Sequence, residues 1–286
     1  MTPTQLVGPF ILFILMAIVG LELRPADFRR VVEAPRAVVA GTLAQLLLLP
    51  LMTWAVVALL ALPPVFGAGA VLIAVSPGAG ISNVLTMLAG ANVALSVTLT
   101  AVASVLSVVT LPLLSALGMR LFLPDAVQVE VPIGALVGQL SVSMLLPIGL
   151  GMWLRTRRPE FALRHAKKLQ RGALVAIGLL LGAAFAFEDG TDLSFADARA
   201  GLFGGAVWTL SAMAIGWGVA RALRLSEADR FTFLIEFSAR NVAVATIAAI
   251  SGLGRLDLTL FGAAYVTVGY PLCTAAAVLR RRLRIA

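Results

Sequence analysis

The stretch AVSPGAGISN, residues 74–83, lies in the middle of an apolar run, roughly residues 67–88, that is long enough to cross a lipid bilayer as one helix. Its proline lacks a backbone N–H and clashes with the preceding helical turn, and its glycines weaken the helix further. Hydrocarbon does not tolerate the unpaired peptide groups of a broken helix. The break therefore predicts either a kink packed against neighbouring helices or, as in many secondary transporters, a backbone that surrounds ions and small solutes.

The composition predicts a polytopic integral membrane protein. The 286 residues are 60% hydrophobic and 13% charged, with a mean hydropathy of +1.00. We therefore expect the Lys and Arg residues behind the net charge of +8 to set the orientation of the chain in a membrane, and not to bind nucleic acid. The single cysteine, Cys273, excludes an internal disulfide and a cysteine metal cluster, and we expect the single histidine, His165, to be a solvated residue of the most basic loop. No cleavable signal is evident before residue 24, so we expect residues 6–23 to form a span.

Apolar segments separated by Gly and Pro turns predict an all-α fold with about nine transmembrane helices. We expect them at about residues 5–23, 37–61, 66–89, 92–117, 132–154, 172–187, 200–220, 230–252 and 257–279. With the N-terminus outside and the C-terminus in the cytoplasm, eighteen Lys and Arg residues lie in inner segments and three in outer loops. The positive-inside rule predicts this orientation, which requires an odd number of spans.

The eighth span is also interrupted, by the polar stretch EFSARN at residues 236–241. The broken helix at 66–89 runs inward and the broken helix at 230–252 runs outward. Two interrupted spans of opposite direction, one in each half, are typical of an inverted repeat. We expect the first repeat to cover residues 1–131 with four spans and the second, inverted repeat to cover residues 132–286 with five.

Glu236 and Arg240 are charged side chains expected at membrane depth. Such residues are functional candidates by default, because a charge at the helix centre costs on the order of 2.5–3.5 kcal/mol. They are four residues apart, so they share a helix face and could instead form a buried ion pair that only fixes helix packing.

Hydroxyl groups form a stripe on one face of the fourth span, at Ser96, Thr100, Ser104 and Ser107. We expect Ser104 and Ser107 to bond to their own backbone or to a neighbouring helix. Neutral hard oxygens joined by one carboxylate suit a small monovalent cation. The sequence therefore favours a cation site built from Ser82, Asn83, Ser96, Thr100 and Glu236. Gln45, taken alone, predicts only an amide that joins helices.

These residues resemble the bile acid:sodium symporter family, in a bacterial form. The resemblance extends over nearly the whole chain and rests on Pro77, Gly78, Ser82, Asn83, residues 92–96, Thr100, Glu236, Asn241 and residues 21–28. It implies a core domain and a panel domain, with the two broken helices crossing in the core. It also implies alternating-access symport of a small organic anion with sodium in the bacterial inner (cell) membrane. We expect a monomer or a weak homodimer, with no cofactor apart from Na⁺ as the coupling ion.

The resemblance assigns roles to individual residues. It places one sodium at the cation site named above, and a second cation at Gln45, Glu236, the backbone near Phe237 and Ala239, and a glutamine that is Arg240 in this chain. It implies substrate contacts at Gly80, Ile81 and Asn241, with Tyr270 facing the same cavity. The family often has a hydroxyl residue where Gly80 stands, which argues against bile-acid-like specificity.

Arg240 allows three hypotheses, because a guanidinium repels sodium from the second site. In the first, Arg240 replaces the second sodium and leaves one coupling ion. In the second, it satisfies Glu236 so fully that the carrier is sodium-independent or proton-coupled. In the third, it binds the substrate's carboxylate or sulfonate directly.

Other classes of protein fit less well. A membrane enzyme would need a nucleophile, a base or a metal cluster, and the interior of the predicted spans contains no His, Asp or reactive Cys. An arsenite-type exporter of similar fold would want a thiol where the chain has Ser76. A sensor or assembly subunit without transport activity remains an alternative, and the sequence does not identify the anion or the direction of transport.

Overall fold

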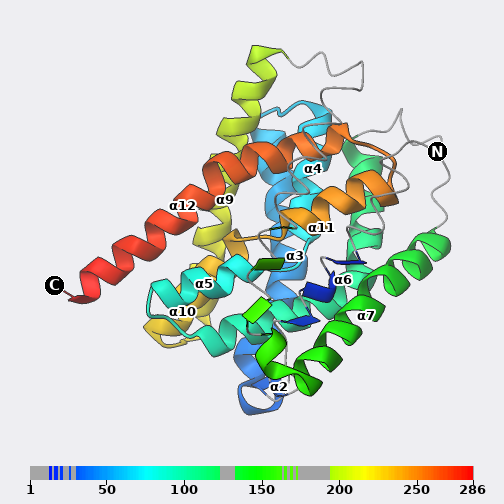
Figure 1. Ribbon diagram of the computed structural model, residues 1–286. Coiled ribbons are helices and arrows are strands. Elements are labelled where there is room, and N and C mark those ends of the chain that lie inside the picture. The colour runs from blue at the N-terminus through cyan, green and yellow to red at the C-terminus, as the bar shows by residue number, and fades with distance from the viewer. Residues whose placement is uncertain are drawn as a thin grey trace.

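The computed structural model describes residues 30–122, 133–162 and 194–285, with isolated residues between 13 and 26 and between 164 and 172. This described part is helical (Figure 1). In chain order its elements are α2 (Arg30–Glu33), α3 (Pro35–Leu59), α4 (Pro64–Val75), α5 (Gly80–Leu88), α6 (Val93–Phe122), α7 (Ile133–Arg157), α9 (Phe195–Ala222), α10 (Glu227–Ser238), α11 (Val242–Ile247), a π-helical turn η3 (Ala248–Gly252), a 3₁₀ turn η4 (Asp257–Thr259) and α12 (Leu260–Ile285).

Within the described residues, four helical stretches are long and apolar enough to cross a membrane. They are Pro35–Leu59, Val93–Gly118, Phe195–Ala222 and Asp257–Leu283, in agreement with the spans predicted at 37–61, 92–117, 200–220 and 257–279. Helix α7 overlaps the span predicted at 132–154. The spans predicted at 5–23 and 172–187 lie largely outside the described residues. The total of nine spans, the repeats 1–131 and 132–286, and the core and panel domains therefore stay predictions.

Both predicted helix breaks are present. Helix α4 ends at Val75, and Ser76 is extended, with φ −65° and ψ 151°. The cause is Pro77, because a proline disfavours helical geometry in the residue before it. The second break separates α10 from α11 at residues 239–241, where Ala239 has φ −96° and ψ 80°.

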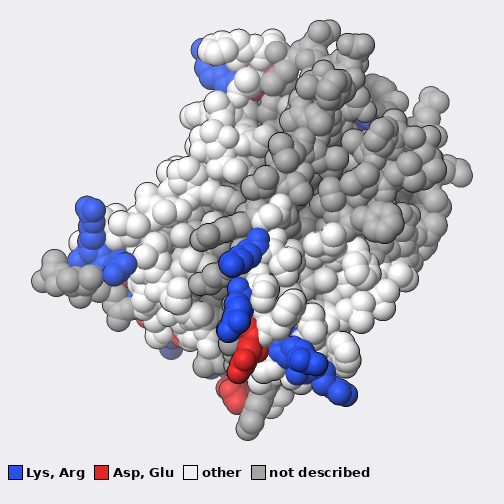
Figure 2. Space-filling view, in the orientation of Figure 1, with Lys and Arg blue, Asp and Glu red and all other residues white. Residues whose placement is uncertain are grey.

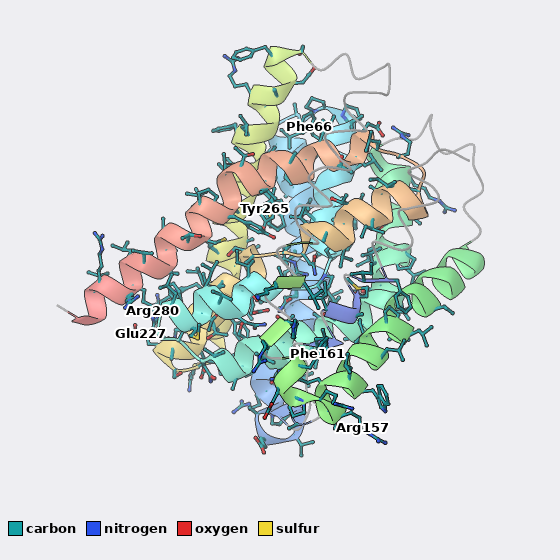
Figure 3. All side chains as sticks on the ribbon, viewed as in Figure 1. Phe66, Arg157, Phe161, Glu227, Tyr265 and Arg280 are labelled. Carbon is teal, nitrogen blue, oxygen red and sulfur yellow. The ribbon has the colours of Figure 1, made fainter. Side chains whose placement is uncertain are left out.

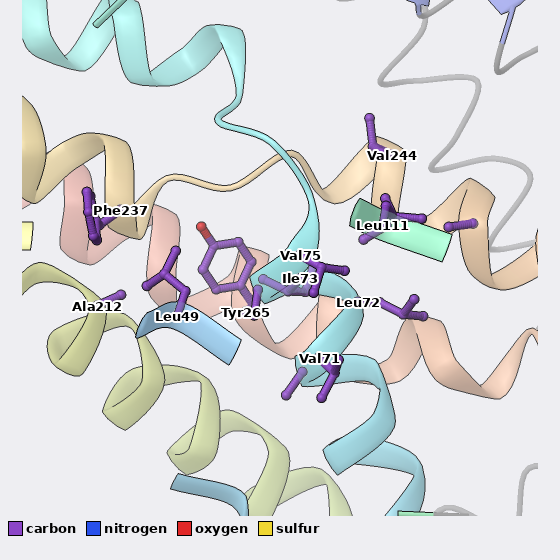
Figure 4. Packing of buried hydrophobic residues seen from close by; sticks show 14 of the residues in the cluster. Leu49, Val71, Leu72, Ile73, Val75, Leu111, Ala212, Phe237, Val244 and Tyr265 are labelled. Atoms are coloured by element: carbon purple, nitrogen blue, oxygen red, sulfur yellow. The ribbon is translucent and has the colours of Figure 1, made fainter. Parts of the chain in front are cut away.

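The two extended segments cross and pair as a short antiparallel bridge between Gly78 and Arg240 (Figure 4). The Ala79 N–H donates to the Ala239 carbonyl at 3.1 Å, and the Asn241 N–H donates to the Pro77 carbonyl at 2.9 Å. The crossing therefore satisfies backbone groups that the breaks remove from their helices, as a buried position in a membrane protein requires.

Long helices surround the crossing. Helix α4 packs against α3 and α6, while α9 packs against α3, α10 and α12 (Figure 1). A buried hydrogen bond joins two of these helices, because Trp208 Nε1 on α9 donates to Thr53 Oγ1 on α3 at 2.8 Å. Around the crossing, aliphatic side chains of α4 belong to one buried cluster with Tyr265 and Phe237, and Tyr265 lies between α4 and Phe237 (Figure 4). The two breaks are thus held in a closely packed interior.

Candidate functional site

Glu236 is the centre of the site. It lies in the last turn of α10 and is 0% exposed, so its carboxylate has no access to solvent. Three hydroxyl groups donate to it: Ser82 and Ser96 to Oε1, and Thr100 to Oε2 at 3.0 Å. A buried carboxylate is tolerated only with such partners.

Local structure places these partners. The first break ends at Ala79, so Ser82 and Asn83 lie in the first turn of α5, directly beside the crossing. Ser96 and Thr100 are one turn apart on α6, and Ser96 Oγ also donates to Asn83 Oδ1 at 2.8 Å. The structure thus brings all five residues of the predicted cation site together.

The cluster has more oxygen contacts than hydrogens. Ser82 Oγ lies within hydrogen-bonding distance of both the Glu236 carboxylate and the Ala79 carbonyl, the latter at 2.7 Å. Ser96 Oγ likewise faces both Glu236 and the Asn83 side-chain oxygen. Each hydroxyl carries only one hydrogen and so donates to one of its two neighbouring oxygens, while the Ala79 carbonyl also accepts from the Ser82 N–H at 2.8 Å. Surplus oxygen lone pairs around one carboxylate are what a small hard cation coordinates.

The Arg240 guanidinium has different hydrogen-bond partners from the Glu236 carboxylate. It is 1% exposed, and its guanidinium donates to Gln45 Oε1 at 2.6 Å, to the Glu236 backbone carbonyl at 3.2 Å and to the carbonyls of Ala74 and Ser76. It makes no ion pair with the Glu236 carboxylate, although both residues are described. The reason is the break: the chain leaves the helix at Ala239, so the four-residue spacing no longer places the two side chains on one helix face.

The other residues predicted for a second cation also meet near the crossing. The Ala239 carbonyl accepts a hydrogen bond from Ala79, while the Phe237 ring stacks on Phe233 with centroids 5.7 Å apart. Gln45 and Arg240 are in direct contact, but Gln45 Nε2 and Arg240 Nε are buried without a hydrogen-bond partner in the described part of the chain. The roles of these residues stay predictions.

The residues predicted to bind substrate lie at the two breaks, except Tyr270, which contacts the second break from α12. Gly80 and Ile81 begin α5, and Asn241 caps α11, accepting a hydrogen bond from the Val244 N–H at 3.2 Å. Tyr270 on α12 donates to the Arg240 carbonyl at 2.8 Å. All except Arg240 are partly exposed. Their placement is compatible with substrate contact, which stays a prediction.

Sequence reasoning missed two residues of the site. Tyr265 on α12 is buried, and its hydroxyl accepts from the Arg240 N–H at 2.8 Å and donates to the Ser238 carbonyl. In Figure 4 this hydroxyl points toward the crossing. A hydroxyl in an apolar span was the available signal. Gly78 was identified as a helix breaker and as part of the family resemblance but not as a site residue, yet a Cβ there would lie 2.6 Å from Glu236 Oε2.

The expectation about the two neighbouring hydroxyl groups on α6 can be compared with the structure. Ser104 and Ser107 donate to carbonyls of their own helix, as expected. Among the described residues, no group of three His, Cys, Asp or Glu side chains could hold a metal ion. Cys273 is a buried free thiol.

The chain is similar to proteins of one known family. It matches the Sodium Bile acid symporter family over residues 9–191, more than half of its length. It is 29% identical over 245 residues to "Probable sodium/metabolite cotransporter BASS1, chloroplastic" of Arabidopsis thaliana, covering 85% of this chain and 59% of that protein. It is 27% identical over 239 residues to the human "P3 protein", covering 83% of this chain and 49% of the relative.

A bacterial relative is "Uncharacterized sodium-dependent transporter YocS" of Bacillus subtilis, 35% identical over 139 residues, or 49% of this chain and 41% of the relative. The chain thus spans about three fifths or less of the length of these curated relatives. The family match includes the first break and the hydroxyls of α6, and the longer alignments extend over more than four fifths of the chain. The chain belongs to the sodium bile acid symporter family.

Proposed function

We propose that the protein is a secondary carrier that moves a small organic anion by alternating access, coupled to one Na⁺ bound by Ser82, Asn83, Ser96, Thr100 and Glu236. The observation that carries the proposal is the buried oxygen cluster, in which two hydroxyls each face two acceptors with one hydrogen. A bound Na⁺ would be coordinated by lone pairs of those oxygens. The carriers among the relatives are named for sodium dependence, which agrees with this choice of ion.

Charge balance explains how cation and anion would assist each other. Glu236 and Arg240 are both buried at the crossing, and their opposite charges sum to zero. Binding of Na⁺ adds one positive charge in a region of low dielectric constant, which favours an anion nearby. The effect is reciprocal, since the anion must raise the Na⁺ affinity by the same factor, typically about 5- to 150-fold.

Arg240 replaces a second sodium in this proposal. Its guanidinium contacts Gln45 Oε1 and the Glu236 backbone carbonyl, and Gln45 and Glu236 are two of the residues that the family resemblance assigns to the second cation. A fixed guanidinium at that position repels another cation. Transport of a monovalent anion with one Na⁺ is then electroneutral.

The proposed placement is the bacterial inner membrane, with the N-terminus outside and the C-terminus in the cytoplasm. Support comes from Figure 1, where α2 and the C-terminal end of α7 lie at one end of the molecule and the first residues of α4 and α9 at the other. The predicted inner loops adjoin the first of these ends. We expect a monomer or a weak homodimer.

The test begins with a substrate. Small carboxylates and sulfonates are screened for a rise in the thermal unfolding midpoint of the purified protein in NaCl and in KCl. Uptake of the best ligand into proteoliposomes is then driven by an inward Na⁺ gradient. We expect Glu236→Gln to abolish both the Na⁺-dependent shift and uptake, because the amide lacks the charge and one acceptor oxygen. Ser104→Ala is the matched control, since that hydroxyl bonds only its own helix.

The stoichiometry has its own test. Reversal-potential measurements are expected to give one Na⁺ per monovalent anion, and Arg240→Gln is expected to raise the Hill coefficient for Na⁺ from about 1 toward 2. Two cations per anion in the unmodified protein would refute the role proposed for Arg240. Uptake driven by a proton gradient, with no response to Na⁺, would instead support a proton-coupled or sodium-independent carrier.

A further inference from the structure

A basic pocket lies at the C-terminal end of α7, away from the crossing. Its volume is about 410 Å³. It is lined by Arg157, Arg158, Pro159, Glu160, Phe161, Arg164 and His165. Figure 3 labels Arg157 and Phe161, which lie at the same end of the molecule as α2. Neither the cation site nor the predicted substrate contacts use any of these residues.

The pocket carries uncompensated positive charge. It contains three guanidinium groups and one carboxylate, that of Glu160. Within the described part of the chain, Arg158 and Arg164 form no ion pair, and Arg157 lies over the Trp153 ring with its guanidinium carbon 5.7 Å from the centroid. Figure 2 shows basic side chains gathered in a row on this face, with an acidic side chain beside them. Like charges held together around a hollow favour an anion within it.

The position of the pocket indicates which anion it meets. On the last turns of α7, Trp153 is 56% exposed, and Leu146 and Leu150 are also exposed. Phe161, which lines the pocket, is 44% exposed. Exposed aromatic rings next to basic residues at the end of an apolar helix are typical of the membrane–water interface. The pocket therefore begins where the apolar surface of α7 ends.

We propose that this pocket binds the phosphate group of an anionic phospholipid, whose acyl chains lie along the exposed leucines and Trp153 of α7. The inference rests on the proposed insertion of the chain in a membrane. Guanidinium groups suit phosphate because their planar N–H pairs donate to two oxygens at once. Basic pockets at the cytoplasmic ends of membrane helices bind such headgroups by this chemistry.

The test measures lipid binding to the whole purified protein by native mass spectrometry, with phosphatidylglycerol and phosphatidylcholine at equal concentration. We expect phosphatidylglycerol to bind at least 10-fold more tightly than phosphatidylcholine. The double variant Arg158→Gln/Arg164→Gln is expected to lose most of this preference. The control is Arg281→Gln/Arg282→Gln, which removes the same charge from an exposed part of α12 and is expected to keep it.

Equal losses in both double variants would overturn the pocket assignment, because the preference would then depend only on net charge. Glycerophosphoglycerol is tested alongside the lipid. If this soluble headgroup binds as tightly as the lipid, the ligand is a soluble phosphate ester and the lipid assignment is wrong. Thermal unfolding confirms that each variant is folded. The measurement of lipid binding needs no transport. The lipid proposal can therefore be refuted while the Na⁺ response that depends on Glu236 is retained, and the Na⁺ proposal can be refuted while lipid binding is retained.

Discussion

Replacing Gly78 by alanine should weaken sodium binding without a second change in chemistry. The added Cβ would lie 2.6 Å from Glu236 Oε2 and 2.9 Å from Thr100 Oγ1. Ordinary contact begins at 3.4 Å, so the carboxylate must retreat by about 0.8 Å or the crossing must open. Overpacking of this kind typically costs about 1–3 kcal/mol. If that energy falls on the arrangement that binds the ion, the Na⁺ affinity drops about 5- to 150-fold.

The assay is the Na⁺ concentration that gives half of the maximal rise in the unfolding midpoint, measured at constant ionic strength with choline as the replacing cation. Gly262→Ala is the control, because its Cβ would meet Val242 at 3.4 Å and Ile73 at 3.7 Å, which are ordinary contacts. We expect this control to match the unmodified protein. A Gly78→Ala protein that is folded and has an unchanged Na⁺ midpoint would show that the ion does not bind beside Glu236.

Three further substitutions test the surroundings of the site. Thr100→Val removes the hydroxyl that donates to Glu236 Oε2. We expect the Na⁺ concentration for a half-maximal rise in the unfolding midpoint to increase about 10-fold, whereas Ser104→Ala leaves it unchanged. Tyr265→Phe leaves two buried backbone groups without their partner, so we expect a loss of about 1–3 kcal/mol in the free energy of unfolding; a loss below about 0.5 kcal/mol would contradict this. Thr53→Val leaves the buried Trp208 indole N–H unpaired, and chemical denaturation should show a loss of about 1–2 kcal/mol that is absent in a Trp208→Phe background.

The proximity of the five residues of the proposed cation site could be predicted because each has a local signal in the sequence. Ser82 and Asn83 adjoin a proline-broken helix, Ser96 and Thr100 share one face of an apolar helix, and Glu236 is a carboxylate within an apolar span. A polar group at membrane depth needs polar partners, so the few available groups are expected to meet. The two helix breaks indicated where in the fold these polar side chains come together.

Contacts that depend on the exact end of a helix could not be predicted. The spacing of Glu236 and Arg240 suggested one helix face, but α10 ends at Ser238 and the guanidinium lies against α3 and α4 instead. Tyr265 was missed for a related reason. Its partners are backbone groups at the break, and these are available to a side chain only because α10 ends there and no longer pairs them within the helix. Helix boundaries are the least reliable part of a sequence interpretation.

The crossing also constrains how the protein is made. Ser82 and Glu236 are 154 residues apart, and the chain is synthesised from its N-terminus, so the hydroxyls of α5 and α6 enter the bilayer long before the carboxylate exists. Glu236 therefore arrives where its hydrogen-bond donors are already inserted. A truncated product that stops before α10 lacks the acceptor, the guanidinium and half of the backbone bridge, and would be left with an open break for quality-control proteases to recognise.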